Sequence, residues 1–289
     1  MKNGNILIIF MMTLVLSSCS NFLDVSDELA EQRNFESIFN SPVDTRRWLN
    51  DVYLGIPDPS NMHASNGYSH AWPILSDEID LNAQANDWNM EIITPSHFRA
   101  NRWSGYWQRI RQANVFLEKV HTIPQSGDAD FIDEAELVFL KAQARFLRAY
   151  YHYLLFELYG PIPIITESAD PDNTKIDYAR NSVDEVVKFI YDELTAVSND
   201  LRDPDLSNEN QLAIPTKGAA LALRAKLMVY AASPLYNGGY INALKVTNKD
   251  GKRLFPDFSV MKWQKALEAC QSFIDYAESG NYDLFVEYD

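Results

Sequence analysis

Aromatic and polar side chains concentrate in residues 55–99, a long segment with no helical periodicity. Such a mixture suits carbohydrate recognition, because a sugar ring offers an apolar face to an aromatic ring and hydroxyl groups to amides and carboxylates. The candidate ligand contacts in this segment are Tyr68, Trp72, Asp77, Glu78, Asn82, Asp87 and Trp88. Burial of the two indole rings against a core would explain Trp72 and Trp88 in another way, so both interpretations stay open.

A second long irregular segment covers residues 235–258 and adds Tyr236, Asn237 and Tyr240 as candidate contacts. Loops of this length on a compact scaffold often carry function. Trp103 and Trp107 differ from these residues because they follow a helical stripe. The stripe predicts that both indoles belong to the core.

Motifs for catalysis are absent from the sequence, which contains no H-E-x-x-H, G-x-S-x-G, P-loop or dinucleotide-binding pattern. The five histidines show no metal-ligand spacing. Asp77 and Glu78 could suit glycoside hydrolysis, but chance pairs are expected among 40 acidic residues. We therefore expect no catalytic residue, no metal and no cofactor. A helical glycoside hydrolase remains the alternative.

The formal net charge of −15 repels phosphate backbones, which argues against a nucleic-acid partner. The sequence has two cysteines, too few for a disulfide framework. Cys270 follows an apolar helical pattern together with Trp263, Ala266, Leu267, Phe273 and Ile274. This pattern predicts a buried thiol that packs as a small hydrophobic group.

The first 18 residues have the character of an export signal. Lys2 precedes an apolar run over residues 6–16 that is too short to span a bilayer comfortably. The following Ser17-Ser18-Cys19 completes a segment that resembles a bacterial lipobox. The resemblance implies cleavage before Cys19, attachment of lipid to its sulfur, and a mature chain of residues 19–289. Several acyl chains on one residue give stable anchoring, and Ser20 by the same resemblance favours the outer membrane.

Helix signals dominate the remaining sequence. Capping residues at Ser41, Asp133, Ser182 and Thr216 each precede an apolar helical pattern, and Asp133 and Ser182 each have a glutamate three positions later. The expected helices cover residues 42–53, 103–120, 134–159, 183–194, 217–232 and 261–279. No strand pattern reaches comparable length. The chain is therefore predicted to be mostly all-α, with at most small β elements in its loops.

The spacing of two helix starts indicates how these helices are arranged. Thr216 follows Ser182 by 34 positions, which is the tetratricopeptide period. The loop at residues 235–258 interrupts the repeat. We expect stacked, tetratricopeptide-like helix pairs with long irregular loops.

Several segments together resemble the SusD/RagB family of outer-membrane nutrient-binding lipoproteins. They are the CSNFLD start at 19–24, the YW…I…AN.FL helix at 106–117, AQARFLRAYY at 142–151 with YGPIP at 159–163, RNSVDEV at 180–186, and the helix ending in ASPLYN at 217–237. The matches occur in the family's order and extend from residue 19 to about residue 282. Members generally continue well beyond residue 289, so the chain resembles the amino-terminal portion of the family.

The resemblance implies a helical receptor at the cell surface, anchored to the outer membrane through Cys19. Its ligand would be a nutrient, most often a glycan and sometimes a peptide. Its partner would be a SusC-type TonB-dependent transporter. A helical-repeat scaffold that binds only proteins is a further alternative to the glycan receptor.

Overall fold

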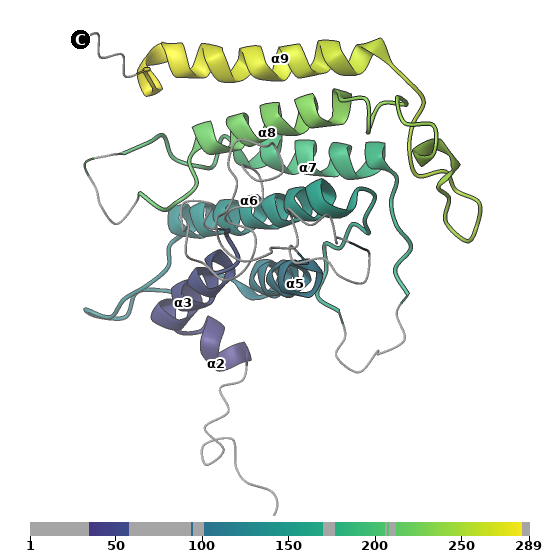
Figure 1. The fold of residues 1–289 in the computed structure, drawn as a ribbon. Helices are drawn as coiled ribbons and strands as arrows, with labels where there is room; N and C mark the ends of the chain where they lie inside the picture. The colour runs from purple at the N-terminus through teal and green to yellow at the C-terminus, as the bar shows by residue number, and fades with distance from the viewer. Residues whose placement is uncertain are drawn as a thin grey trace, which may run out of the picture.

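The computed structural model describes residues 35–57, 94, 101–169, 177–205, 207 and 212–284, which form a stack of helices (Figure 1). In chain order the elements are α2 Phe35–Phe39, α3 Pro42–Tyr53, α5 Trp103–Lys119, α6 Glu134–Tyr159, α7 Val183–Val197, α8 Lys217–Ala232, η2 Ala243–Lys245, α9 Val260–Tyr276 and η3 Ala277–Asn281. Over the described ranges, β structure is limited to two isolated antiparallel bridges, Ile123 with Ile132 and Thr247 with Arg253. The prediction of an all-α fold with small β elements is confirmed.

Successive helices lie side by side, so the stack rises from α5 through α6, α7 and α8 to α9 (Figure 1). This arrangement agrees with the expected helix pairs. The long helix α6 is at the centre, and apolar side chains are buried around most of its circumference. A helix that is hydrophobic on all sides is stable only when neighbours cover it, and α5, α7 and α8 do so.

Local capping explains where these helices begin. The Ser41 side chain accepts a hydrogen bond from the backbone N–H of Asp44, and Thr216 accepts one from Ala219. At α7 the full capping box forms, because the Glu185 carboxylate also accepts from the backbone of Ser182 at 2.7 Å. Each cap satisfies backbone donors that the first turn of a helix leaves unpaired.

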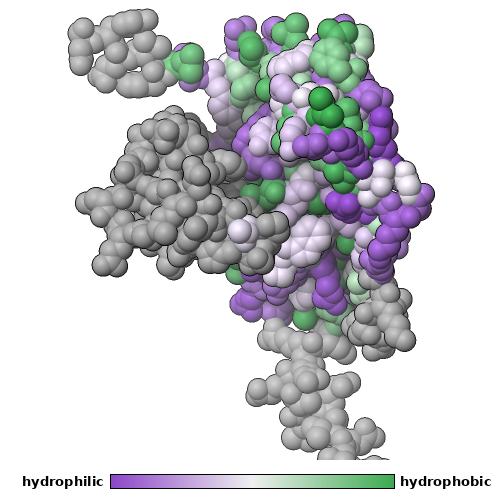
Figure 2. All heavy atoms as spheres, turned by 45° about the vertical axis from the view of Figure 1, so that its right-hand side comes forward, coloured by the Kyte–Doolittle hydropathy of each residue, from purple (hydrophilic) through white to green (hydrophobic). Residues whose placement is uncertain are grey.

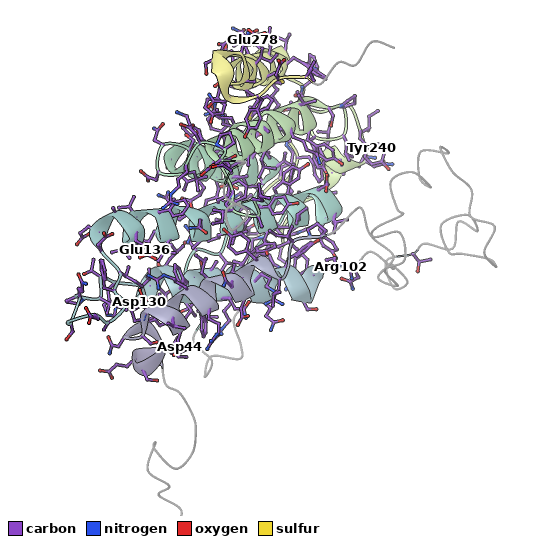
Figure 3. All side chains as sticks on the ribbon, turned by 90° about the vertical axis from the view of Figure 1, so that its left-hand side faces the viewer. Asp44, Arg102, Asp130, Glu136, Tyr240 and Glu278 are labelled. Atoms are coloured by element: carbon purple, nitrogen blue, oxygen red, sulfur yellow. The ribbon has the colours of Figure 1, made fainter. Side chains whose placement is uncertain are left out.

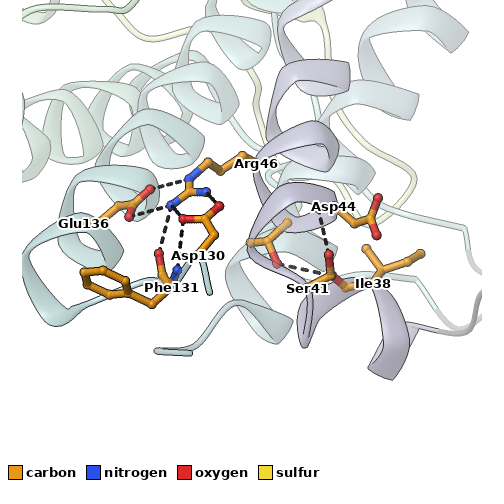
Figure 4. A network of polar contacts seen from close by, with 8 residues as sticks. Ile38, Ser41, Asp44, Arg46, Asp130, Phe131 and Glu136 are labelled. Carbon is orange, nitrogen blue, oxygen red and sulfur yellow. Dashed lines mark hydrogen bonds and ion pairs between the residues drawn. The ribbon is translucent and has the colours of Figure 1, made fainter. Parts of the chain in front are cut away.

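The second predicted capping box, at α6, is only half formed, because Arg46 binds the Glu136 carboxylate (Figure 4). Asp133 accepts from the backbone N–H of Glu136 at 2.7 Å, as expected. The Glu136 carboxylate, however, accepts from Arg46 Nε of α3 at 2.6 Å. Arg46 also donates to Asp130 and to the backbone oxygen of Phe131. A tertiary contact between α3 and the start of α6 has therefore replaced the local one.

The apolar pattern of α9 is only partly buried, which corrects the prediction for Cys270. Ala266 and Ala269 are buried where α9 packs on α8, and Cys270 is half-buried beside them. Leu267 is 67% exposed and Trp263 is 45% exposed. The helix carries apolar residues on more than one face, and α8 covers one of them.

Candidate ligand-binding site

A segment that we call the strap, residues 162–169, follows α6 and supplies part of a pocket. Helix α6 ends at Gly160, whose positive φ of 70° suits glycine, and Pro161 then prevents continuation of the helix. Beyond that point the strap passes along α5. Every second strap residue from Pro163 onward lines the pocket.

The pocket has a volume of about 680 Å³, which lies within the range of small-ligand sites. Its walls come from the first turns of α5, from the strap, and from the chain shortly before α7. The lining residues are Trp103, Ser104, Trp107, Gln108, Ile110, Arg111, Pro163, Ile165, Glu167, Ala169, Asp177 and Tyr178.

An aromatic cluster holds one of the pocket's partly exposed rings, that of Trp103. This ring makes T-shaped contacts with Trp107 and Tyr159, at 5.5 Å and 5.1 Å between ring centroids. Asn101 Oδ1 accepts hydrogen bonds from the backbone N–H of Trp103 and from the Tyr159 hydroxyl. These contacts hold the indole in place while 40% of the Trp103 surface stays exposed.

The prediction that Trp103 belongs to the core is therefore wrong, whereas Trp107 is half-buried and packs against the core. Trp103 is the first residue of α5. Its neighbours Trp107 and Tyr159 contact it edge to face, which leaves part of its ring open. A helical stripe predicts the face on which a side chain lies. It does not predict whether a neighbouring helix extends far enough to bury that side chain.

Polar groups from several parts of the chain complete the pocket. Gln108 and Arg111 come from α5, and Glu167 comes from the strap. Asp177 Oδ2 lies 3.2 Å from Lys249 Nζ in an exposed ion pair, and Tyr178 beside it is 43% exposed. Donors and acceptors around an aromatic surface fit a ligand with an apolar face and many hydroxyl groups.

The residues predicted from the second long loop have different environments. The Tyr236 ring is buried against Phe156, at 4.6 Å between centroids, and burial raises the pKa of its hydroxyl above the ordinary value. Asn237 is fully buried and accepts from the backbone N–H of Ser259 at 2.8 Å. These contacts hold the loop to the helical stack. Tyr240 is 52% exposed and lies toward the same edge of the stack as Arg102 (Figure 3).

The remaining predicted site residues lie outside the described residues. They are Cys19, Tyr68, Trp72, Asp77, Glu78, Asn82, Asp87 and Trp88. Sequence reasoning missed Trp103, Tyr178 and the strap as parts of a pocket. One available signal was the position of Trp103, which closely follows the aromatic-rich segment at residues 55–99.

Two other features of the described ranges bear on possible roles. No group of three or more histidine, cysteine or acidic residues is gathered there as a metal ion would require. Among the helices in those ranges, none combines the length and apolar character needed to cross a bilayer.

The described residues thus form a helical stack with a polar-rimmed aromatic pocket beside α5. The SusD-like family model described as "Starch-binding associating with outer membrane" matches residues 21–229. The chain belongs to this SusD-like family. No curated protein matches the chain.

Solved structures with this fold include several SusD-like proteins. BT4246 shares 27% identity at a TM-score of 0.67, with 86% of this chain and 42% of that chain covered. A SusD-like protein of Bacteroides fragilis shares 18% identity at a TM-score of 0.59, with 89% and 41% covered. A structure titled "Laminarin binding SusD-like protein" shares 21% sequence identity at a TM-score of 0.52, with 67% of this chain and 41% of that chain covered. The chain thus spans less than half the length of these relatives.

Proposed function

We propose that this protein is a glycan-binding subunit at the outer membrane, and that the pocket beside Trp103 contributes to its ligand site. The observation that carries the proposal is the partly exposed Trp103 ring, held rigidly within a polar-rimmed pocket. Membership in a family described as starch-binding and associated with the outer membrane supports the same function. A relative named for laminarin binding adds a second glucan to test.

The pocket offers two complementary contacts to a sugar. The apolar face of a pyranose ring would pack on the Trp103 indole. Its hydroxyl groups would exchange hydrogen bonds with Gln108, Arg111 and Glu167, which line the same pocket. Because Trp107 and Tyr159 already hold the indole, little side-chain entropy is lost when ligand binds.

The carboxyl groups of the described residues can be compared with those that a glycoside hydrolase needs. A glycoside hydrolase needs a carboxylic acid whose pKa is raised so that it can donate a proton near neutral pH. Among the described residues, each carboxyl group with a shifted pKa is shifted downward by arginine or lysine partners: Asp130, Glu185, Glu193 and Asp257. These shifts concern the described residues only, and Asp77 and Glu78 lie outside them. We propose a receptor that breaks no bond, in line with the lack of catalytic motifs in the sequence, and reducing-sugar release by the purified protein would contradict it.

The proposal extends to the membrane and to a partner. Cleavage before Cys19 and lipidation of its sulfur would anchor residues 19–289 to the outer membrane, facing the cell surface. A SusC-type TonB-dependent transporter would then receive the glycan. Support comes from the lipobox resemblance and from the family's association with the outer membrane. Mass spectrometry of the mature terminus tests the anchor, and co-purification with a transporter barrel tests the partner.

The experiment that tests the ligand site is calorimetric titration with maltoheptaose and laminarin. Trp103→Ala should weaken binding roughly tenfold or more, since buried aromatic anchors dominate binding sites. Trp263→Ala is a matched control, because Trp263 is exposed to a similar degree on α9. Equal binding by both variants and the wild type would exclude Trp103 from the site. Trp72→Ala and Trp88→Ala test the contacts predicted at residues 55–99 in the same way.

A further inference from the structure

Side chains from the helices hold the strap. They form the hydrogen bonds to its backbone that a neighbouring strand would form in a sheet. Asn114 of α5 donates through Nδ2 to the backbone oxygens of Ile165, at 3.3 Å, and Glu167, at 3.0 Å. Arg148 of α6 donates through Nη1 to the backbone oxygen of Thr166 at 3.1 Å. The contacts bind three consecutive carbonyl groups of the strap.

Backbone N–H groups of the strap also donate hydrogen bonds to side chains. The N–H of Ile165 donates to Nε2 of His152 at 3.3 Å, and the N–H of Ile164 donates to Oδ1 of Asn181 at 2.9 Å. At the far end, Ser168 donates through its N–H and its hydroxyl to the Glu118 carboxylate, both at 2.6 Å. The strap is therefore held through both its N–H groups and its carbonyl groups.

The supporting side chains are themselves fixed. Arg148 Nη1 donates to Asn114 Oδ1 at 3.0 Å, and Arg148 Nη2 donates to Glu193 of α7 at 2.8 Å. Asn114 and His152 are fully buried, and Arg148 is 8% exposed. Buried, mutually bonded polar groups have few alternative arrangements, so they define the path of the strap closely.

None of these three supporting residues lines the pocket, whereas Pro163, Ile165 and Glu167 of the strap do. We infer that Asn114, Arg148 and His152 are positioning residues, which set the strap wall of the pocket and thereby its glycan affinity without touching ligand. The inference rests on the proposed function for the role of the pocket. The hydrogen-bonded support itself does not depend on that function.

Asn114→Asp tests the inference selectively. The replacement keeps the oxygen that accepts from Arg148, but it removes the Nδ2 donor and places a second oxygen against the carbonyls of Ile165 and Glu167. Loss of two hydrogen bonds should weaken maltoheptaose or laminarin binding roughly tenfold. It should also speed amide hydrogen exchange at 162–169 while exchange in α7 and α8 stays unchanged.

Arg145→Gln is the matched control. Arg145 donates to the same Glu193 carboxylate at 2.8 Å, but its observed side-chain hydrogen bonds go to Glu193 and not to the strap. This variant should lower the unfolding midpoint and leave glycan affinity and strap exchange as in the wild type. Should Asn114→Asp fail to fold, Glu118→Ala loosens the far end of the strap from an exposed position and should give the same local changes.

Wild-type affinity and wild-type strap exchange in a folded Asn114→Asp or Glu118→Ala protein would overturn the inference. If the wild type itself binds neither glucan, the proposed function fails for those ligands. Hydrogen exchange at 162–169 then still decides whether the three residues position the strap.

Discussion

Nε2 of His152 accepts a hydrogen bond from the backbone N–H of Ile165 at 3.3 Å. The other ring nitrogen, Nδ1, lies 2.8 Å from the backbone oxygen of Arg148, which can only accept. The ring is therefore neutral and carries its proton on Nδ1. It is fully buried, between the rings of Trp107 and Phe189. Protonation of Nε2 would remove the acceptor for the strap and add a charge beside Arg148.

This arrangement predicts a pH-dependent stability. Burial lowers the pKa of His152 to about 4. The unfolded chain binds this proton near pH 6.5 and the folded chain only near pH 4, so stability is lost as the pH falls through that window. The loss should approach roughly 3 kcal/mol. Other groups titrate there too, so the measurement compares urea unfolding of the wild type and His152→Gln across the window.

The free-energy gap between these two proteins should narrow as the pH falls from about 7 to about 4. A gap that is the same at both ends of the window would show that His152 does not change its protonation between the two states as predicted.

Glu193 should be the most sensitive acidic residue of the core. Burial alone would raise its pKa, but hydrogen bonds from Arg145 and Arg148 outweigh burial and lower it. Glu193→Gln leaves two arginines facing a neutral amide at a site that is largely closed to water. We expect a loss of about 3 kcal/mol in the free energy of unfolding.

The control for this variant is Asp192→Asn, which removes an exposed partner of Lys188 on the same helix. Its effect should stay below about 0.5 kcal/mol. Similar losses for the two variants in urea titrations would mean that the buried cluster contributes no more than a surface pair.

The capping box of α7 should contribute measurably to stability. Ser182→Ala removes the side chain that accepts from the N–H of Glu185, and it should cost about 1 kcal/mol. Ser182→Asn supplies another accepting oxygen and should restore most of that loss. Thermal unfolding of the three proteins checks this, and equal stability of all three would refute a role for the cap.

The outer side of α9 should promote self-association of the isolated chain. Trp263, Leu267 and Ile274 are 45%, 67% and 43% exposed, and their spacing puts them on one face of the helix. Figure 2 shows apolar side chains on the upper part of the molecule. Ile241, Phe258 and Val260 are exposed as well. Apolar side chains exposed on one helix face favour association.

Leu267→Lys should reduce concentration-dependent association in sedimentation velocity without lowering the unfolding midpoint. Ala266→Lys is the contrasting variant, because Ala266 is buried against α8 and should be strongly destabilised by a charge. Unchanged association after Leu267→Lys would exclude the outer face of α9 as the contact.

The sequence by itself determined the longer helices and the residues at which most of them begin, but it did not predict α2, η2 or the last turn of α7. Ser41, Ser182 and Thr216 cap helices through bonds that span three positions, so the pattern and the structure agree. Where a distant partner competes, local reasoning fails, and the Glu136 carboxylate binds Arg46 across 90 positions. Capping patterns contain no information about such a partner.

The site was decided by the tertiary structure. Trp103 stays 40% exposed although it contacts the rings of Trp107 and Tyr159. Tyr236 and Asn237 are buried because the loop folds back onto α6 and the start of α9. The strap depends on Asn114 and Arg148, which lie 34 positions apart and meet only when α5 packs on α6. Burial and long-range hydrogen bonds depend on how the helices stack on one another. The apolar periodicity within one helix does not specify how helices stack.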